Sequence, residues 1–347
     1  MEKFLALGPS EMTRTRLTTA RGQELNLPLP ATGYGLSRRK LDAFLFDHAK
    51  SLGVDAHDGV DVRSIDTSED GKKELTLRPS GSAEEFNVRA SVVIIAHGRR
   101  SRLDRKLNRP FFQKRSPYVA FKRHFSVRTA GFDEELPSLE GLVELHTFRG
   151  GYCGVSFAED NIVNVCTIFD QDLITLDRID AEGVWSFLSQ GRSPLARRLS
   201  TLEARDDDSL AIAQIPLTLK ERSSQNILFV GDAAGMIAPL AGDGQAMAME
   251  SALMLANLLH EELPTIPFQR WNELWQKKYA NRLRLGQWLQ RAMIRPQIAV
   301  PSVHVLNALP SVGRALIGLT RSASRRPLSK MPASRTDQCS AGQPTNV

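Results

Sequence analysis

The sequence is poor in cysteine and has no long apolar segment. Its three cysteines, Cys153, Cys166 and Cys339, form neither a Cys-x-x-Cys pair nor a cluster with histidine, so no metal site is indicated. No run approaches about 18 uninterrupted apolar residues and the amino terminus has no signal-peptide pattern, which predicts a globular cytoplasmic protein with free thiols. A Gly-x-Ser-x-Gly elbow is also absent, so hydrolase chemistry lacks support.

An excess of positive charge is absent outside the carboxyl-terminal part of the chain. The formal net charge is +6, yet from Arg291 onward eight basic residues stand against the single acid Asp337. Because aromatic residues do not alternate with these basic residues, no nucleic-acid groove is predicted. Residues 296–319 are apolar and contain proline. They suggest either peripheral contact with anionic lipid or, as we favour, a packed pair of helices before a disordered tail.

The chain does contain a strand-type apolar run that ends in small residues. Residues 226–230 lead directly into Gly231-Asp232-Ala233-Ala234-Gly235. Ligands of parallel sheets bind where such strands end. Gly231 permits a sharp turn, Asp232 places an acceptor at its tip, and the small side chains after it leave room for a ligand.

A second group of small residues leads into a long helix. Pro239 precedes Gly242, Asp243 and Gly244, and apolar spacing then predicts a helix as far as Glu262. Its expected buried stripe is Met249, Ala252, Ala256 and Leu259. The N-terminus of a helix has unpaired N–H groups and a partial positive charge, which favour an anion such as a reduced flavin. An ordinary strand, turn and helix in which glycine and alanine serve only close packing is the alternative.

These segments resemble the second FAD motif of the para-hydroxybenzoate hydroxylase-like flavoproteins, a superfamily that also holds geranylgeranyl reductases and flavin halogenases. The resemblance implies that Asp232 binds the ribityl chain of FAD and that Gly242 and Gly244 lie beside the isoalloxazine ring. The cofactor site implied in this way also includes Gly231, Ala233, Pro239 and Asp243.

Two further segments agree with this resemblance. Residues 35–42 resemble the family's Arg-x-x-Leu-Asp helix start, with Ser37 as N-cap. They imply that Arg38 lies near the flavin, although a solvated arginine fits the spacing equally well. The apolar stripe expected for that helix is Leu41, Phe44, Leu45, Ala49 and Leu52. Residues 92–96 predict a strand that enters a turn at Gly98, similar to the family's Asp-Gly motif. His97 replaces the aspartate and is expected to serve the turn rather than acid–base chemistry.

Polar residues of the central region are candidates for the substrate side. Residues 150–156 and 161–167 predict a hairpin, and its Gly-Gly-Tyr segment resembles the substrate-domain strands of the reductase-like branch of the family. Tyr152 either contacts substrate or flavin or simply packs. Cys153 and Cys166 can face each other across it. Residues 118–126 alternate so that Lys122 and His124 share one strand face, which either lines the crevice or is solvated.

The predicted fold is α/β (α+β): an FAD/NAD(P)-binding Rossmann-like lobe, an inserted β-rich substrate lobe and C-terminal helices. The predicted boundaries are 1–108 and 209–262 for the FAD-binding lobe, 109–208 for the substrate lobe, 263–320 for the helices and 321–347 for a basic disordered tail. A solvated return loop is expected at 205–208.

The Gly-x-Gly-x-x-Gly turn with which this family begins does not occur in the sequence, so the FAD-binding lobe is predicted to be N-terminally incomplete. The part of the site for the isoalloxazine and ribityl groups is encoded, whereas the part for adenine and pyrophosphate is not. Poor FAD affinity is therefore expected. The explanations are a start codon placed too far downstream, which we favour, or a shortened chain with changed cofactor use.

The resemblance implies an FAD-dependent oxidoreductase with NAD(P)H as electron donor. We expect a monooxygenase that hydroxylates an apolar or aromatic small molecule. The flavin carries out the redox chemistry, so no catalytic residue is assigned. The alternatives are a double-bond reductase of the geranylgeranyl reductase type and a non-catalytic binding module. No nucleic-acid partner is expected, and the oligomeric state is left open.

Overall fold

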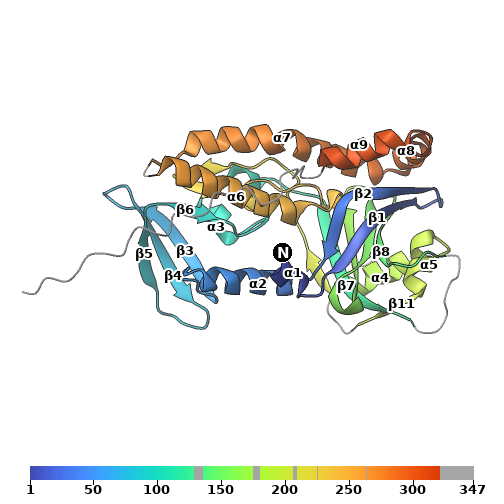
Figure 1. Ribbon diagram of the computed structural model, residues 1–347, viewed down its shortest axis with the longest axis horizontal. Coiled ribbons are helices and arrows are strands. Elements are labelled where there is room, and N and C mark those ends of the chain that lie inside the picture. The colour runs from blue at the N-terminus through green and yellow to red at the C-terminus, as the bar shows by residue number, and fades with distance from the viewer. Residues whose placement is uncertain (129–135, 175–179, 206–208, 225, 264, 321–347) are drawn as a thin grey trace, which may run out of the picture.

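The computed structural model describes residues 1–128, 136–174, 180–205, 209–224, 226–263 and 265–320. They form three sheets connected and covered by helices (Figure 1). This arrangement confirms the predicted mixed α/β class. The return loop expected at 205–208 lies outside the described residues except for Arg205, and the expected tail at 321–347, with Cys339, lies outside them entirely.

The largest sheet has eight strands and occupies one end of the molecule (Figure 1). Its order is β11-β7-β10-β9-β8-β1-β2, and β12 also pairs with β7. Its strands are β1 (Ser10–Thr19), β2 (Glu24–Gly35), β7 (Tyr118–Val127), β8 (Gly141–Phe148), β9 (Gly151–Phe157), β10 (Val163–Asp170), β11 (Leu202–Ala204) and β12 (Leu210–Ile212). The predicted hairpin is confirmed as β9 and β10, which pair antiparallel.

Alternation along these strands gives the sheet two different faces. One face carries Phe121, Val155 and Val165 and packs against α4 (Ala181–Ser189) and α5 (Pro194–Ser200). The second face, which we call the inner face, carries Tyr118, Ala120, Tyr152 and Ile168, and these pack against Met236 and Leu240. The inner face is therefore the one turned toward the segment that follows Gly235.

The two cysteines of the hairpin do not face each other, contrary to the expectation from the sequence. Cys153 lies opposite Thr167, and Cys166 lies opposite Gly154. Since the register differs by one residue, the two thiols point to opposite faces of the sheet. Both are free.

Strands β1 and β2 also belong to the large sheet, although they come much earlier in the chain. β1 runs parallel to β8, with Leu17 opposite Leu145, and β2 lies beyond β1. The predicted assignment of all of 1–108 to the FAD-binding lobe is therefore wrong for residues 10–35. A parallel pairing joins segments that are distant in sequence, so local patterns do not reveal it.

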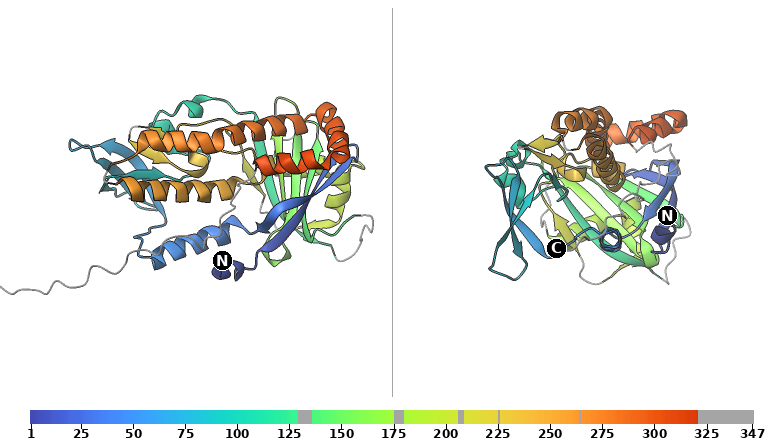
Figure 2. Two further views of the ribbon diagram at one scale, coloured as in Figure 1. Left: turned by 45° about the horizontal axis from the view of Figure 1, so that its top comes forward. Right: turned by 60° about the vertical axis from the view of Figure 1, so that its left-hand side comes forward.

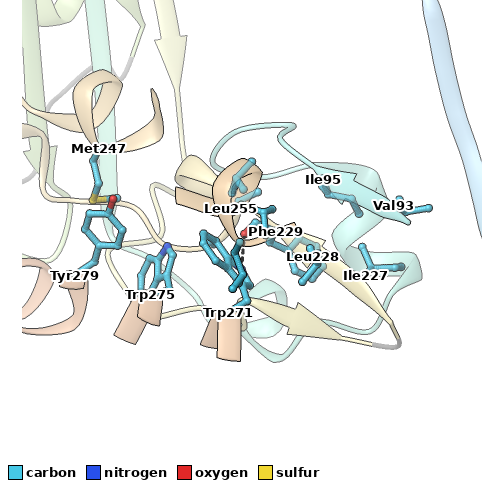
Figure 3. Packing of buried hydrophobic residues seen from close by; sticks show 14 of the residues in the cluster. Val93, Ile95, Ile227, Leu228, Phe229, Met247, Leu255, Trp271, Trp275 and Tyr279 are labelled. Carbon is cyan, nitrogen blue, oxygen red and sulfur yellow. Dashed lines mark hydrogen bonds between the residues drawn. The ribbon is translucent and has the colours of Figure 1, made fainter. Parts of the chain in front are cut away.

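A three-stranded sheet of order β13-β14-β6 forms the centre of the other main region. β14 (Ile227–Phe229) pairs parallel with β6 (Val93–Ile95) and antiparallel with β13 (Ser223–Ser224). α7 (Phe268–Met293) packs Trp271, Trp275 and Tyr279 into the core beside it, all three fully buried (Figure 3). The Trp271 indole N–H donates to the Phe229 carbonyl at 3.2 Å, which fixes the helix on the strand.

Helix α6 (Gly244–Glu262) begins and ends as predicted, but it buries a different face. Its buried residues are Met247, Ser251, Leu255 and Leu258. Met249, from the predicted stripe, is 46% exposed, and Ala252 and Ala256 are exposed as well. The helix is rich in alanine, leucine and methionine on all sides, so its sequence does not define a single apolar face.

Helix α2 (Arg38–Ser51) starts where the sequence predicted, with the Ser37 hydroxyl accepting from the Lys40 N–H. The predicted buried stripe is correct only in part. Leu41 is buried and Phe44 and Ala49 are partly buried, whereas Leu45 and Leu52 are 41% and 72% exposed. The first turn of α2 is held to the large sheet by the Ser37 N–H, which donates to the Glu159 carboxylate at 2.6 Å.

The remaining elements complete the framework. A separate sheet of order β3-β4-β5 consists of β3 (Val60–Thr67), β4 (Lys73–Pro79) and β5 (Phe86–Ala90). The short helices are α1 (Glu2–Leu5), α3 (Arg102–Lys106), η1 (Pro110–Gln113), η2 (Glu159–Asn161), η3 (Gly231–Ala233) and η4 (Pro239–Ala241). The predicted terminal helix pair is confirmed as α8 (Pro296–Ala308) and α9 (Pro310–Thr320), beside α7 (Figure 2). Across the described ranges, none of the helices is long and apolar enough to cross a membrane.

Candidate functional site

The turns that follow β6 and β14 lie side by side. The two strands are parallel neighbours with Phe229 opposite Ile95, and the Val230 N–H donates to the Ile95 carbonyl at 3.1 Å. Both strands end at the same edge of the sheet, where ligands of parallel sheets bind. The structure thus brings the turn at Gly98 next to the turn at Asp232.

Asp232 lies inside a group of cations. Its Oδ1 atom is buried and has no hydrogen-bond partner within the described part of the chain. Burial raises the pKa of this carboxyl above its ordinary value, although the nearby charges of Lys220, Arg38 and Arg99 lower it. Three segments distant in sequence therefore place positive charge around one half-buried acid. Such a field favours an anionic ligand.

Of these cations, Arg38 was predicted and the other two were not. The Arg38 guanidinium is exposed and forms an ion pair with Asp42 at 3.0 Å, one turn further along α2. Arg99 donates from Nη1 to the Ala213 carbonyl at 3.1 Å. Lys220 is almost completely buried. Its position three residues before β13 carries no motif, so no local signal pointed to it.

The predicted glycines fall into two kinds. Gly98 and Gly242 have φ angles of +84° and +65°, and a Cβ at either position would meet nothing within 4 Å. At Gly231 a Cβ would lie 3.0 Å from the Ala248 side chain, and at Gly235 it would lie 2.5 Å from the Trp275 ring. Close packing explains Gly235, and at Gly231 a φ of +57° adds to it, in line with the sharp turn expected there. Gly98 and Gly242 border open space that a ligand can use.

The remaining predicted residues surround the start of α6. Pro239 is exposed at the start of η4, and Gly242 and Gly244 flank Asp243. The Asp243 carboxylate pairs with Arg282 of α7 instead of capping α6. The first N–H groups of α6 therefore have no side-chain cap from Asp243. At this end the helix carries partial positive charge.

A network of buried ionic groups contacts the two turns on their buried side. Asp104 and Arg109 are fully buried and pair at 2.8 Å, and His97 Nε2 lies 3.2 Å from Asp104. Arg109 also donates to the carbonyl of Ala233, which is itself buried in the core, at 2.9 Å. Burial raises the pKa of Asp104, but His97, Arg109 and a backbone hydrogen bond from Ser101 lower it below its ordinary value. His97 and Ala233 thus shape the turns from their inner side.

The candidates on the substrate side lie at different distances from this centre. Tyr152 lies in the buried cluster against which Leu240 packs, and burial raises the pKa of its hydroxyl well above the ordinary value. Lys122 and His124 share one strand face, as predicted, and this is the inner face that also carries Tyr152, because Lys122 pairs with Cys166 and His124 pairs with Asn164. Lys122 is one cross-strand row beyond Tyr152 and His124 is two rows beyond, each row adding about 7 Å.

An apolar cavity of about 150 Å³ lies between the inner face and the C-terminal helices. Leu17 and Leu145 of the sheet, Leu289 and Met293 of α7, and Ile317 of α9 contribute to its lining. Hydrocarbon side chains predominate, so the cavity suits an uncharged ligand. Sequence patterns did not reveal it, because its walls come from separate parts of the chain.

The cavity adjoins the predicted flavin position. Leu240 and Ala241 of η4 line it and directly precede Gly242. A molecule in the cavity would therefore be separated from the open side of Gly242 by one short turn. The structure combines a polar, positively charged centre at Asp232 with an apolar compartment beyond Gly242.

FAD fits the residues of this centre. The unpartnered oxygen of Asp232 can accept a hydrogen bond from a ribityl hydroxyl, and the surrounding positive charge suits an anionic cofactor. The open positions at Gly98 and Gly242 leave room for the close approach of a cofactor. When bound, FAD supplies the transfer of electrons between a donor and a substrate. The chain's own groups hold and orient it.

Comparisons with known proteins agree with this site. A family model described as FAD binding domain matches residues 1–265. A search of the curated proteins by sequence finds no match. The structure is similar to that of the flavin-dependent brominase Bmp2, with a TM-score of 0.71 at 17% identity over 92% of this chain and 78% of that chain.

Two other solved structures share the fold. PqsL from Pseudomonas aeruginosa, a probable FAD-dependent monooxygenase, has a TM-score of 0.63 at 15% identity over 87% of this chain and 84% of that chain. A geranylgeranyl bacteriochlorophyll reductase-like protein from Thermoplasma acidophilum has a TM-score of 0.62 at 18% identity, over 89% and 83%. Since the family model covers most of the sequence, the chain belongs to the FAD binding domain family, and the predicted FAD cofactor and flavoprotein fold are confirmed.

Proposed function

We propose that the protein is a flavin monooxygenase that hydroxylates an apolar or single-ring aromatic molecule, with NAD(P)H as electron donor. The observation that carries this proposal is the apolar cavity that adjoins Gly242 through Leu240 and Ala241. An uncharged substrate held there would lie at the edge of the site that fits FAD. The protein contributes position and exclusion of water, and the coenzyme contributes the reaction.

The size of the cavity supports a small substrate. In another protein, an engineered apolar cavity of about 150 Å³ stays free of water and takes up benzene. The cavity here has a similar volume and a lining dominated by leucine, isoleucine and methionine. The fold neighbour PqsL has been solved with 2-aminobenzoylacetate, which carries one aromatic ring. Ligands of this size are the class we propose.

A double-bond reductase is the second candidate, and its support is the Gly150-Gly151-Tyr152 segment, which resembles the reductase-like branch of the superfamily. Tyr152 belongs to the buried cluster against which Leu240 packs. The glycine pair itself adds less, because packing alone explains it. A Cβ at Gly151 would lie 2.5 Å from the Ile168 carbonyl, and one at Gly150 would lie 2.9 Å from the Ile174 side chain. The cavity is also small for a long prenyl chain.

The test is a turnover assay with the full chain, FAD, NAD(P)H and a panel of single-ring aromatic compounds. We expect oxygen uptake coupled to a product that has gained one oxygen atom, and no turnover without oxygen. Reduction of a substrate double bond in the absence of oxygen would establish the second candidate instead. Protein that stays colourless and gains no thermal stability from FAD would support a non-catalytic binding module.

A cavity variant links the assay to the proposed compartment. Leu289→Phe should fill part of the cavity and reduce substrate affinity while FAD binding stays unchanged, because Leu289 lines the cavity and lies on α7. Trp288→Phe is the matched control, since Trp288 is the preceding residue and is 62% exposed. Equal loss of substrate affinity in both variants would contradict this location for the substrate.

A further inference from the structure

Lys220 is a buried cation between the two cofactor turns. It is 1% exposed, and its Nζ atom donates to the carbonyl of Arg99 and to the carbonyl of Asp232, at 2.6 Å each. Arg99 belongs to the turn after β6, and Asp232 belongs to the turn after β14. One side chain thus holds together two turns that come from distant parts of the sequence.

The surroundings of this ammonium group are unusual for a structural lysine. It lies 4.5 Å from the centre of the Phe111 ring, and both of its hydrogen-bond partners are backbone carbonyls. Burial and the nearby charge of Arg109 lower its pKa to about 8, with a smaller contribution from Arg99, while Asp232 and Asp104 act in the opposite direction. A buried lysine lowers the stability of the folded protein unless its hydrogen bonds compensate, and such costly groups cluster at functional sites.

We propose that Lys220 is a positioning residue of the FAD site, which ties the turn at Gly98 to the turn at Asp232. This follows from its two hydrogen bonds to backbone carbonyls, one in each turn. The positive charge of Lys220 also lowers the pKa of the Asp232 carboxyl, together with the charges of Arg38 and Arg99. This inference rests on the FAD site and not on the monooxygenase reaction.

The first test uses Lys220→Met, which keeps the length of the side chain and removes its charge and its donors. The control is Lys73→Met, since Lys73 is also buried and donates to the Thr67 hydroxyl at 2.6 Å, but in the separate sheet of β3, β4 and β5. Amide hydrogen exchange is measured on both full-length proteins without FAD. In Lys220→Met, amides of residues 97–101 and 231–235 should exchange at least about tenfold faster, as the loss of charge-assisted hydrogen bonds implies.

The second test measures FAD affinity as a function of pH. Removal of the Lys220 charge leaves the burial of Asp232 less compensated, so the carboxylate takes up a proton at higher pH. In Lys220→Met the weakening of FAD binding on acidification should therefore begin at higher pH than in the wild type. Lys73→Met should keep the wild-type profile. A role limited to structural support would not move this profile.

Each outcome decides the proposal. Unchanged exchange in the two turns, or faster exchange spread evenly over the whole chain, overturns it, as does an unshifted FAD profile. If Lys220→Met does not fold, Lys220→Gln takes its place, because its uncharged amide can still donate one of the bonds, and the same two readouts apply. Should the wild type not bind FAD, the FAD site itself is disproved, while hydrogen exchange still decides whether Lys220 ties the turns.

Discussion

A methyl group added at Gly235 would lie 2.5 Å from Trp275, whereas one added at Gly98 would meet nothing within 4 Å. Glycine is therefore required for different physical reasons at these two positions. The first is fixed by the packing of α7 on the turn. The second borders the space that we assign to FAD, and its φ of +84° is unfavourable for other residues.

This difference gives a prediction for two matched variants. Gly235→Ala should lower the free energy of unfolding by about 1–3 kcal/mol through overpacking against Trp275. Gly98→Ala should cost about 1–2 kcal/mol through its backbone angle and should also weaken FAD binding. Urea unfolding and flavin fluorescence titration measure the two effects. Equal loss of FAD affinity at both positions would contradict the distinction.

Asp232 gives a second prediction, in which stability and binding change in opposite directions. Its pKa is raised in the folded protein, so folding favours its protonated form, and the stability contribution present at low pH is lost as the pH rises through the folded value. Asp232→Asn should therefore unfold at a higher temperature than the wild type at pH 7 without FAD. It should also bind FAD about tenfold or more weakly, because a charged acceptor is lost.

Scanning calorimetry and FAD titration check these two results together. Asp42→Asn is a suitable control, because Asp42 is an exposed partner of Arg38 on α2. A variant of Asp232 with wild-type FAD affinity would count against the assignment of the ribityl position.

Among the elements, α6 shows most clearly that the limits of a helix can be predicted correctly while its buried face is predicted wrongly. Its start at Gly244 and its end at Glu262 follow from local signals. Its rotation is set by contacts with η3, where Ser251 accepts from the Gly231 N–H at 2.9 Å. A serine thus occupies the centre of the buried face, because it satisfies a backbone donor in the turn.

The orientation of α6 can be tested with two leucines of the same helix. Leu255 is 1% exposed and Leu253 is 54% exposed. Leu255→Ala should lower the free energy of unfolding by about 2–5 kcal/mol, as is usual for a buried leucine, and Leu253→Ala should change it by less than about 0.5 kcal/mol. Chemical denaturation of both variants measures the difference. Similar losses would mean that α6 buries both faces.

For the whole molecule, one buried acid adds an ionic link to the apolar packing between the large sheet and a covering helix. Glu144 of β8 is 1% exposed and accepts from Arg198 of α5 through both oxygens at 2.7 Å, and from His146 at 3.1 Å. Burial alone would raise the pKa of Glu144, but hydrogen bonds and charges from His146 and Arg198 lower it to about 2, from an ordinary value of 4.5. This cluster links β8 to the helix that covers the sheet.

Acid stability should therefore depend on Glu144. With a lowered folded pKa, its contribution is complete above pH 4.5 and is lost as the pH falls through about 2. Glu144→Gln should cost about 3–5 kcal/mol at pH 7, because Arg198 stays buried without its partner, and should flatten the stability curve between pH 4.5 and 2. Thermal unfolding over this pH range is the measurement. An unchanged slope would show that other carboxylates dominate.

Local sequence determined much of this protein. The apolar runs that became β6 and β14, the turn residues Gly98 and Asp232, and the Ser37 cap were all recognisable, because each depends on neighbours within a few residues. The link to flavoproteins rested on the same short segments. For that reason the cofactor and the fold class could be predicted from the sequence alone.

Tertiary structure decided the rest. It placed β1 and β2 in the large sheet, rotated α6, formed the cavity and brought Lys220, Arg38 and Arg99 to Asp232. Each of these depends on contacts between segments far apart in the chain, and such contacts are chosen by the packing of the whole core rather than by local propensity. A buried lysine held by two distant carbonyls looks like any other lysine in the sequence, since only folding brings its partners together.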